Sequence, residues 1–536
     1  MKRLAATLAV LAAIAIAALW TIEGGFGPRT ELKIVSGSEN EALEPLIMDW
    51  ASDNRVDVTV SYKGSVDISR ILGEGTSGEF DAVWPANSLW IELGDTGKVV
   101  HHDASILRSP VVLGVKRSIA EKLGWQGRDD ITVQAIQKAA RDGAFRLAMT
   151  SATQSNSGAS AYFGFLYALA GNPDVLTLDG LNDPALQEQV RDLLGQVDRS
   201  SGSSGWLKDS LVTHYDEFDA MFNYEALVIE ANQALTAAGK EPLYVIYPAN
   251  GLSVADSPLG YVDKGDAAKE EAFLALQAYL LSPPVQARLV SLGRRAGLIG
   301  LAADQADPQV WNSAWGIDLA RAIAPIPTPS SEVIGEALRL YQTELRKPSL
   351  TIWVLDVSGS MEGEPIEQLK QAMTLLLDPD AAAVNLLQPS SHDVTIVLPF
   401  NHHAFPPMTV TGADRDQLAS ILREVRNLRA DGGTDLYGAL WRAIETLKPY
   451  YNEGTLFDYL PAIVAMTDGA SDRDNRNKLL ASLRDSGFGQ DVPIHAIAFG
   501  AADEEQLKEL NEATIGRLFT AGSDLAAALR KAKGYN

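Results

Sequence analysis

The chain has 536 residues, a formal net charge of −24 at pH 7 and no cysteine. Its length exceeds what one compact core supports, so we expect two or three domains. The acidic balance argues against a nucleic-acid partner, because a phosphate backbone needs a basic face. The absence of cysteine excludes disulfides, thiolate metal ligands, cysteine nucleophiles and an acylated lipoprotein cysteine.

The N-terminus predicts export. Lys2 and Arg3 precede the apolar run Leu4 to Trp20, whose length is close to the minimum of roughly 17 residues for a membrane-spanning helix. The paired positive charges should stay in the cytoplasm. For residues 1–22 two interpretations stay open: a secretory signal with a small-residue cleavage site at Ala15-Ile16-Ala17, or a retained membrane anchor, which we prefer. Both make the rest extracytoplasmic, either at the cell membrane or, after cleavage, periplasmic or secreted.

Strand and helix patterns alternate beyond the Gly- and Pro-containing linker at residues 23–29. The first region has the order βαβαβ, which implies a parallel sheet with helices on its faces. Its elements are strands 32–36, 56–62 and 80–84 and helices 42–51 and 66–72. A second αβ region follows, with strands 110–115, 145–149 and 243–247 and helices 160–170, 270–281 and 284–292.

A proline-rich stretch at residues 325–329 interrupts the periodicity, and one helix over 331–345 leads to Lys347-Pro348, the expected domain junction. The remaining segment predicts a second α/β unit. Its strand candidates are nearly all apolar, as expected for parallel strands covered on both faces. They are 350–356, 394–400, 462–467 and 494–499, with helices at 366–377, 415–428, 436–447, 478–485 and 504–510.

Hard oxygen ligands follow the first strand of this unit, in Asp356-Val357-Ser358-Gly359-Ser360. Ligands of doubly wound sheets collect beyond the carboxyl ends of the strands. One carboxylate and two hydroxyls within a single turn suit Mg²⁺. Alone, the pattern is better explained as a hydroxyl-rich helix cap. Two further motifs favour a metal: Thr434 in a glycine turn that opens a helix, and Asp468 directly after a buried strand.

The order and spacing of these motifs resemble the metal-ion-dependent adhesion site of von Willebrand factor A domains, over residues 348–536. The resemblance implies a doubly wound, Rossmann-like α/β domain with one divalent metal, Mg²⁺ or alternatively Mn²⁺ or Ca²⁺. It also implies that a protein partner supplies an acidic group to the ion, which is a strong local charge. The ligands carried over are Asp356, Ser358, Ser360, Thr434 and Asp468.

Catalysis is not expected at this site. Metal-assisted hydrolysis needs a general base beside the activated water, and no His or Glu accompanies the five residues within their motifs. The His402-His403 pair, with His392 nearby, has no carboxylate at a metal-ligand spacing. We therefore interpret it as an exposed polar loop.

Residues 30–346 are similar to the type II, two-lobed bacterial extracellular solute-binding proteins (periplasmic binding proteins). The resembling stretches are 32–38, 80–87 and 283–286. Two lobes that close on a solute need neutral donors at helix N-termini. Helix capping or turn formation explains each candidate equally well, and the solute function could have been lost. The candidates are Ser36, Ser38, Asn40, Thr153, Ser155, Asn156, Ser157, Tyr215, Asn223 and Tyr224.

Two glycine-rich segments are not interpreted as nucleotide sites. Gly73 to Gly78 matches G-x-G-x-x-G, but a helix precedes it and a strand follows, which is the wrong order for a dinucleotide fold. Ser201 to Gly205 is interpreted as a flexible loop. Three functions remain: a membrane-tethered binding protein with a metal-dependent protein partner, a transport receptor for a small-molecule solute, and, least favoured, a metal-dependent hydrolase.

Overall fold

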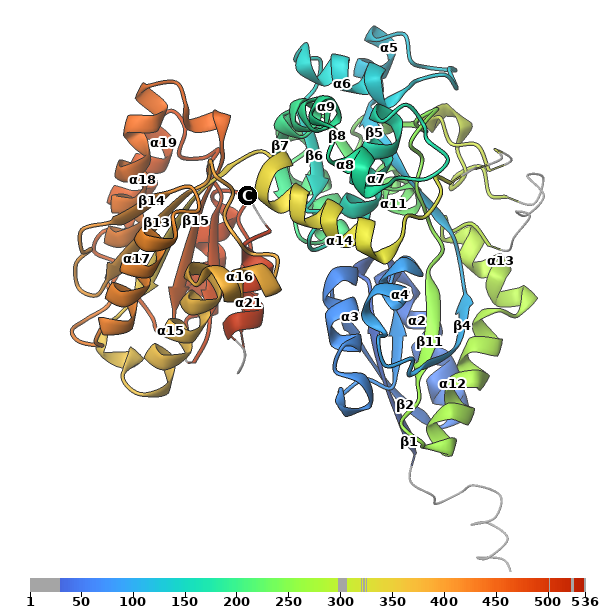
Figure 1. Cartoon of the computed structure of the whole chain (residues 1–536), viewed down its shortest axis with the longest axis horizontal. Coiled ribbons are helices and arrows are strands. Elements are labelled where there is room, and N and C mark those ends of the chain that lie inside the picture. The colour runs from blue at the N-terminus through green and yellow to red at the C-terminus, as the bar shows by residue number, and fades with distance from the viewer. Residues whose placement is uncertain are drawn as a thin grey trace, which may run out of the picture.

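The computed structural model describes residues 29–296, 306–319, 321, 323, 325–500, 502–521 and 525–534. Figure 1 shows two lobes stacked end to end, with a third unit beside them. We call these lobe 1, lobe 2 and the C-terminal domain. The expected signal or anchor, residues 1–22, lies outside the described residues. None of the described helices is long and apolar enough to cross a membrane.

Lobe 1 contains a mixed five-stranded sheet in the order β2-β1-β3-β11-β4. The strands β1, β2 and β3 are parallel, as the βαβαβ order predicts, and β11 runs antiparallel to both β3 and β4. The strands are β1 (Thr30–Ser36), β2 (Val56–Tyr62), β3 (Ala82–Trp84), β4 (Val100–Ser105) and β11 (Pro258–Val262). The helices are η1 (Ser38–Leu43), α2 (Glu44–Asn54), α3 (Ser65–Leu72), η2 (Gly75–Ser77), α4 (Leu89–Gly94), α12 (Ala267–Leu280) and α13 (Pro283–Ser291).

Lobe 2 contains a second mixed sheet, in the order β10-β5-β8-β6-β7, with β9 also paired to β5. Its strands are β5 (Ser109–Lys116), β6 (Leu147–Thr150), β7 (Val197–Ser201), β8 (Ala220–Tyr224), β9 (Leu243–Ile246) and β10 (Val254–Ala255). Its helices are α5 (Arg117–Lys122), α6 (Val133–Arg141), α7 (Asn156–Leu169), α8 (Leu178–Leu181), α9 (Pro184–Gly195), α10 (Ser204–Thr213), η3 (Tyr215–Glu217) and α11 (Glu225–Ala237).

The described part of the chain crosses between the lobes in three places: from β4 to β5, from β10 to β11, and after α13, where Arg295 pairs with Glu225 of lobe 2. Trp84 of lobe 1 donates from its indole nitrogen to the hydroxyl of Ser257 in the second crossing, at 2.9 Å. The backbones of Arg108 and Arg295 exchange hydrogen bonds of 2.8 and 3.1 Å beside the first crossing. Short connections of this kind allow two lobes to rotate about them as bodies.

A helical segment leads from lobe 2 to the C-terminal domain. It follows η5 (Ser313–Trp315) and consists of α14 (Ser331–Leu340) and the π-helical turn η6 (Tyr341–Leu345). The apolar face of α14 is part of the core of lobe 2. Figure 1 shows α14 lying along this lobe.

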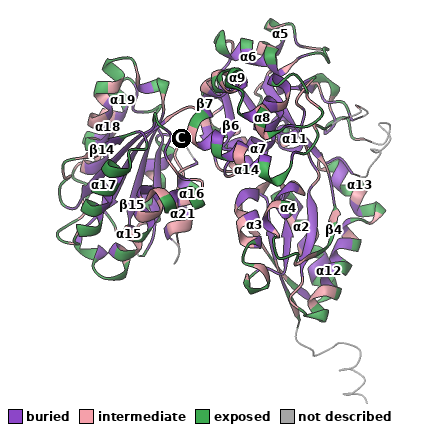
Figure 2. Cartoon of the chain, in the orientation of Figure 1, coloured by how far each residue is buried: buried purple, intermediate pink, exposed green. Residues whose placement is uncertain are grey.

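The C-terminal domain is a doubly wound α/β unit with the strand order β14-β13-β12-β15-β16-β17. All pairs are parallel except β13 with β14. Every residue of β12, β13 and β15 is buried, as expected for strands covered on both faces (Figure 2). The strands are β12 (Ser349–Asp356), β13 (Val394–Phe400), β14 (Met408–Thr411), β15 (Leu460–Thr467), β16 (Ile494–Ala498) and β17 (Leu518–Thr520).

Helices cover both faces of this sheet. One apolar cluster joins it to α15, α17 and α21, and a second joins it to α18, α19 and α20. The helices are η7 (Gly359–Met361), α15 (Glu364–Leu377), α16 (Pro379–Val384), α17 (Arg415–Asn427), α18 (Leu436–Asn452), η8 (Leu456–Asp458), α19 (Arg476–Asp485), α20 (Glu504–Glu512) and α21 (Leu525–Ala532).

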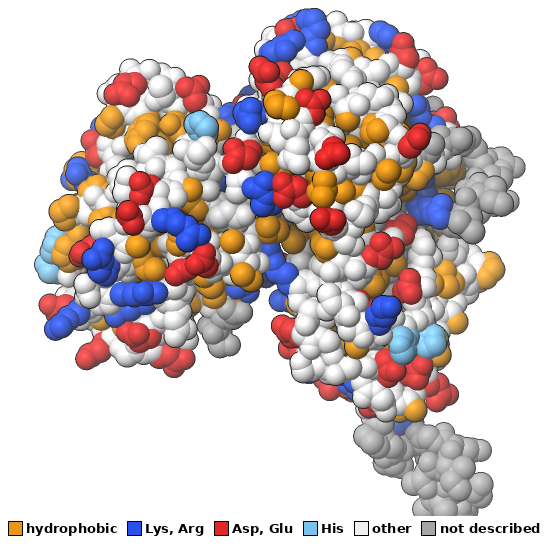
Figure 3. All heavy atoms as spheres, viewed as in Figure 1, with side chains coloured by type: hydrophobic (Ala, Val, Ile, Leu, Met, Phe, Trp, Pro, Cys, Tyr) orange, Lys and Arg blue, Asp and Glu red, His pale blue; other side chains and the backbone are white. Residues whose placement is uncertain are grey.

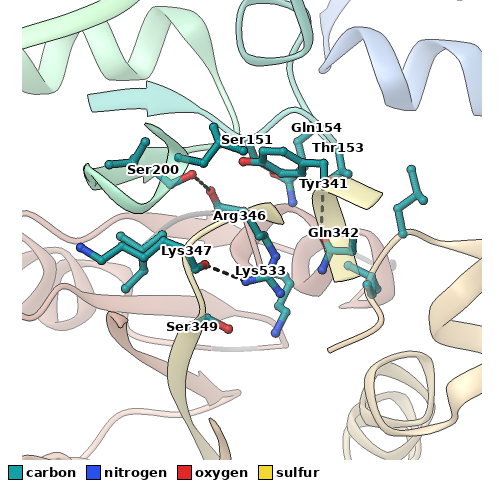
Figure 4. A pocket seen from close by; sticks show the side chains of 16 residues that line it. Ser151, Thr153, Gln154, Ser200, Tyr341, Gln342, Arg346, Lys347, Ser349 and Lys533 are labelled. Carbon is teal, nitrogen blue, oxygen red and sulfur yellow. Dashed lines mark hydrogen bonds between the residues drawn. The ribbon is translucent and has the colours of Figure 1, made fainter. Parts of the chain in front are cut away.

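The C-terminal domain contacts both lobes. Arg70 of lobe 1 donates to the carbonyl of Asn385 at 2.8 Å, and Gln154 of lobe 2 donates to the carbonyl of Arg530 at 2.6 Å. The Trp206 indole of α10 packs against the core of the C-terminal domain. A cavity of about 30 Å³ lies at this boundary. Figure 4 shows its lining, with Ser200 of lobe 2 and Lys533, the residue after α21.

Candidate metal site and solute cleft

The predicted metal ligands are distributed over three loops at the carboxyl edge of the C-terminal sheet. Asp356 ends β12, Asp468 follows the neighbouring strand β15, and Thr434 precedes α18. Asp356 Oδ1 accepts a hydrogen bond from the Ser358 backbone nitrogen at 2.8 Å, which folds the first loop back on itself. The Ser358 and Ser360 hydroxyls lie 3.1 Å apart. The Ser360 hydroxyl donates to Asp468 Oδ1 at 2.8 Å. Four of the five residues thus form one continuous polar cluster.

Backbone hydrogen bonds hold the Thr434 turn against this cluster. The Gly359 nitrogen donates to the Gly432 carbonyl at 2.9 Å, and the Asp472 nitrogen donates to the Thr434 carbonyl at 3.0 Å. Gly432 has a φ of +84°, which a side chain rarely tolerates. The Asp435 carboxylate accepts from the Gly438 nitrogen and caps α18. It is therefore engaged in capping, while Asp356 and Asp468 face the cluster.

Both carboxylates of the cluster lie in an environment that disfavours their charge. Asp356 is fully buried and Asp468 is 5% exposed. Burial raises the pKa of each, and Asp468 raises that of Asp356 further. Asp356 Oδ2 also accepts from the Thr467 hydroxyl at 2.6 Å. Within the described residues no basic side chain forms an ion pair with either carboxylate, so a cation would relieve their repulsion.

The donor set fits a hard divalent cation. Among the described residues no three His, Cys, Asp or Glu side chains are grouped to hold a metal. The cluster has only two carboxylates, and its remaining donors are hydroxyls. A site with few carboxylates and several neutral hydroxyl oxygens suits Mg²⁺, which retains several water ligands. His402 and His403 are exposed in the loop after β13, with ring centres 4.6 Å apart.

A cavity of about 290 Å³ lies between the lobes and reaches the C-terminal domain. From lobe 1 it is lined by Ser38, Glu39, Glu41, Tyr62, Lys63, Gly64, Ser65 and Asp67. From lobe 2 it is lined by Gln154, Ser155, Asn156, Gly202, Ser203, Trp206 and Asp209. Arg517 and Lys531 of the C-terminal domain complete the wall. We call this cavity the cleft.

Three of the predicted solute-binding residues line the cleft: Ser38, Ser155 and Asn156. Others are buried behind the wall. Ser36 accepts from the Asn40 amide at 3.1 Å, and Tyr224 accepts from the Asn156 amide at 3.0 Å. Ser157 is likewise buried and Thr153 lines the boundary cavity of Figure 4 instead. Asn223 donates to the Ser204 carbonyl, and Tyr215 lies beneath Lys116.

Side chains from the two lobes meet across the cleft. The Ser203 hydroxyl of lobe 2 donates to the Ser38 hydroxyl of lobe 1 at 3.2 Å. The Trp90 indole of lobe 1 donates to Asn156 Oδ1 at 2.7 Å. The lobes are therefore in contact, and the polar groups that would meet a solute already pair with one another.

The interpretation of residues 201–205 as a flexible loop is wrong. Ser201 ends β7 and Ser203 caps α10, accepting from the Trp206 nitrogen. Ser204 is 1% exposed and lies 2.9 Å from the Ser155 hydroxyl. A hydroxyl before an amphipathic run was the available signal for this helix start. The Gly73 to Gly78 segment is a turn at the surface that includes η2, and it follows the helix α3 and precedes the strand β3, as expected.

Glu39 is a cleft residue that sequence reasoning missed. Its carboxyl group is buried, and Oε1 has no hydrogen-bond partner among the described residues. Burial raises its pKa to about 7, although its own backbone and Arg294 act in the opposite direction. Nothing in the pattern around Glu39 distinguishes it from an ordinary exposed residue in the first turn of a helix.

Two family models match the chain. Residues 32–295 match the bacterial extracellular solute-binding protein family, and residues 352–531 match the von Willebrand factor type A domain. Inter-alpha-trypsin inhibitor heavy chain H2 of Mus musculus is 32% identical over 124 residues, which are 23% of this chain and 12% of the mouse protein. An uncharacterized protein of Synechocystis sp. is 25% identical over 178 residues, 33% of this chain and 38% of that protein.

Solved structures resemble the two-lobed region. The sulfate-binding protein SubI from Mycobacterium tuberculosis aligns with a TM-score of 0.39 and 17% identity, over 57% of this chain and 96% of its own. A ferric binding protein from Campylobacter jejuni aligns with a TM-score of 0.41 and 12% identity, over 58% of this chain and 98% of its own.

The fold and the family matches define an α/β protein of two domains. The chain consists of a bacterial extracellular solute-binding protein domain followed by a von Willebrand factor type A domain. The fold class and the family resemblances inferred from the sequence are thereby confirmed.

Proposed function

We propose that this chain is an extracytoplasmic binding protein, anchored through residues 1–22, whose C-terminal domain docks a protein partner through a divalent metal. The observation that carries this proposal is the pair of buried carboxylates, Asp356 and Asp468, which are linked through Ser358 and Ser360. Among the described residues neither carboxylate forms an ion pair. Asp356, Ser358, Ser360, Thr434 and Asp468 would hold the ion. The bound ion, Mg²⁺ or alternatively Mn²⁺ or Ca²⁺, would supply a positive charge to which an acidic group of the partner binds.

The metal proposal is tested by calorimetry on the full chain. We expect Mg²⁺ binding to disappear in Asp356→Ala and to persist in Asp435→Ala, because Asp435 caps α18. Equal Mg²⁺ affinity in wild type and Asp356→Ala would refute the metal site. Copurification from detergent-extracted membranes, with and without a chelator, then tests the partner: its retention should require the metal.

The cleft favours a second function, that of a substrate receptor for a transport system. Its polar lining and volume of about 290 Å³ suit a small solute. A solute that binds only the folded chain must raise its thermal stability by mass action. A thermal-shift screen of small solutes tests this function separately from the metal. We propose no catalytic activity, and hydrolysis that vanished in Asp356→Ala would contradict this.

The domain limits of this proposal are 30–346 for the solute-binding domain and 348–536 for the von Willebrand factor type A domain. Cell fractionation tests the anchor: a retained anchor keeps the chain with the membrane after a high-salt wash, while a cleaved signal releases it.

A further inference from the structure

We propose that the C-terminal domain completes the cleft with basic side chains, and that the cleft takes a small anionic solute held by both domains. The inference rests on the proposed solute function. Lys63 of lobe 1 lines the same cavity as Arg517 and Lys531 of the C-terminal domain. A solute bound there would contact three parts of the chain at once.

Lobe 2 fixes the position of Lys531. This residue lies in the last turn of α21, between two points of attachment. Gln154 donates to the neighbouring Arg530 carbonyl at 2.6 Å, and Ser200 donates to the Gly534 carbonyl at 3.4 Å. The basic end of α21 is thus tied directly to the solute-binding domain.

An aromatic contact fixes Arg517. Its guanidinium carbon lies 5.8 Å from the ring centre of Trp206, which belongs to lobe 2 and lines the cleft. The guanidinium carbon also lies 5.3 Å from the ring centre of Phe519. Cation–π contacts of this kind orient a guanidinium. Arg517 is therefore held at the cleft wall by a residue of lobe 2.

Two of the four carboxylates that line the cleft are already paired with cations. Asp67 accepts from Arg70 at 2.9 Å, and Asp209 lies 2.9 Å from Lys208. In the described parts of the chain, neither Lys63 nor Lys531 forms an ion pair. Figure 3 shows basic side chains in the notch between the C-terminal domain and lobe 1.

Like charges from different domains are close enough to disfavour one another. Partial burial lowers the pKa of Lys531, and Lys63 lowers it further against the opposing effect of Asp67. Burial likewise lowers the pKa of Arg70, and Arg530 adds to this effect against the opposing Asp67. A bound anion would relieve this repulsion. Basic residues often stabilise the last turn of a helix, which accounts for Lys531 alone but not for Lys63 or Arg517.

Neutral donors in the same cavity suit an anion as well. Ser38, Ser155 and Ser203 line it from both lobes. Hydroxyls hydrogen-bond to carboxylate, phosphate or sulfate oxygens without a charge of their own. We therefore infer a small solute that carries a carboxylate, phosphate or sulfate group. Lysine and arginine side chains would neutralise its charge, and serines would form hydrogen bonds to it.

Calorimetry of the full chain at low ionic strength tests the inference, with inorganic phosphate, sulfate and succinate as probes and chloride to match ionic strength. We expect one probe to bind wild type, with affinity about fivefold lower in Lys531→Gln and Lys63→Gln, since an ion pair at a partly exposed lysine is worth up to about 1 kcal/mol. Lys531→Arg should retain binding. Lys508→Gln serves as the control, because Lys508 is exposed on α20.

Unchanged affinity in Lys531→Gln and Lys63→Gln, or no binding of any probe by wild type, would overturn the inference. A neutral solute that binds wild type and Lys531→Gln equally would leave the solute function standing and refute only the anionic class. Mg²⁺ binding in the same variants reports separately on the metal proposal, and it should not change.

Discussion

Gly64 of lobe 1 lies directly against the backbone carbonyl of Gln154 in lobe 2. A Cβ atom at Gly64 would overlap that oxygen, although its φ is ordinary. Gln154 in turn donates from its side chain to the Arg530 carbonyl of the C-terminal domain. Gln154 therefore contacts both lobe 1 and the C-terminal domain.

Gly64→Ala should hold the lobes apart. The added methyl group meets backbone rather than a flexible side chain, so relief requires movement of one lobe about the crossing segments. We expect a larger radius of gyration by small-angle X-ray scattering and weaker binding of any cleft solute. Gly195→Ala is the matched control, because a Cβ at Gly195 meets nothing within 4 Å. Identical scattering of both variants would show that the contact does not limit closure.

Asp435→Ala should destabilise the C-terminal domain without removing the metal. The carboxylate of Asp435 accepts from the Gly438 nitrogen at 2.9 Å and also from the Asn475 amide. Loss of such a cap typically costs about 1 kcal/mol. Mg²⁺ at 100 times its dissociation constant should still stabilise the variant by about 2.7 kcal/mol, as for wild type. Thermal unfolding with and without Mg²⁺ measures both effects; a variant that lost the Mg²⁺ effect would place Asp435 among the ligands.

Asp393→Asn should strongly destabilise the junction between the domains. Asp393 is fully buried, forms a bidentate ion pair with Arg346, and accepts from the Ser349 nitrogen at 2.7 Å. Removing its charge leaves Arg346 buried and unpaired, which costs roughly 3–5 kcal/mol. Glu336→Gln, which breaks a more exposed pair with Arg339, should cost about 0.5 kcal/mol or less. Urea unfolding of the two variants compares them, and equal midpoints would contradict the expected difference.

The same pair predicts acid sensitivity. Burial alone would raise the pKa of Asp393, but Arg346, Lys533 and hydrogen-bond donors hold it at about 2, below the ordinary 3.8. The unfolded chain therefore takes up this proton first as the pH falls. The stabilisation is complete above about pH 4 and decreases towards pH 2, by about 2 kcal/mol in total. The difference in unfolding free energy between wild type and Asp393→Asn should narrow by about 2 kcal/mol when it is measured from pH 5 down to pH 2.

The sequence predicted best what depends on local pattern. Strand β13 has the predicted bounds, Val394–Phe400, because a strand covered on both faces is a continuous apolar run. The polar edge strand β4 was missed, since its sequence VHHDAS has no apolar alternation. Strand β11 was missed because it returns to lobe 1 from far along the chain. Helix α7 begins at Asn156, four residues earlier than predicted, because small and polar residues fill its first turn.

The metal site and the cleft likewise differ in how well local sequence pattern predicts their residues. Asp356 and Asp468 each follow a recognisable buried strand, so topology alone predicts that they lie at one edge of the sheet. Lys531 and Arg517 lie in the cleft only because the C-terminal domain docks on lobe 2 through Trp206. No local pattern encodes that contact between domains. Cleft residues from the far domain therefore required the structure.

Glu39 predicts a pH dependence of opposite sign to that of Asp393. Its pKa rises from the ordinary 4.5 to about 7 because its carboxyl is buried, so the folded chain holds a proton that the unfolded chain has lost between these values. Stability contributed by this group is present below about pH 4.5 and is lost as the pH rises to 7, by about 3 kcal/mol. Above pH 7 this stability is fully lost, and the contribution of Glu39 to the free energy of unfolding no longer changes with pH.

Glu39→Gln isolates this effect, because the amide keeps the shape of the neutral carboxyl and does not titrate. We expect the melting temperature of the solute-binding domain to rise in wild type, relative to Glu39→Gln, as the pH falls from 8 to 5. Glu41→Gln is the control: Glu41 is an exposed neighbour on the same cleft wall. If the melting temperatures of wild type and Glu39→Gln change equally with pH across this range, the carboxyl of Glu39 is solvated and ionised. The cleft would then carry a negative charge that weakens anion binding, so this measurement also bears on the class of solute.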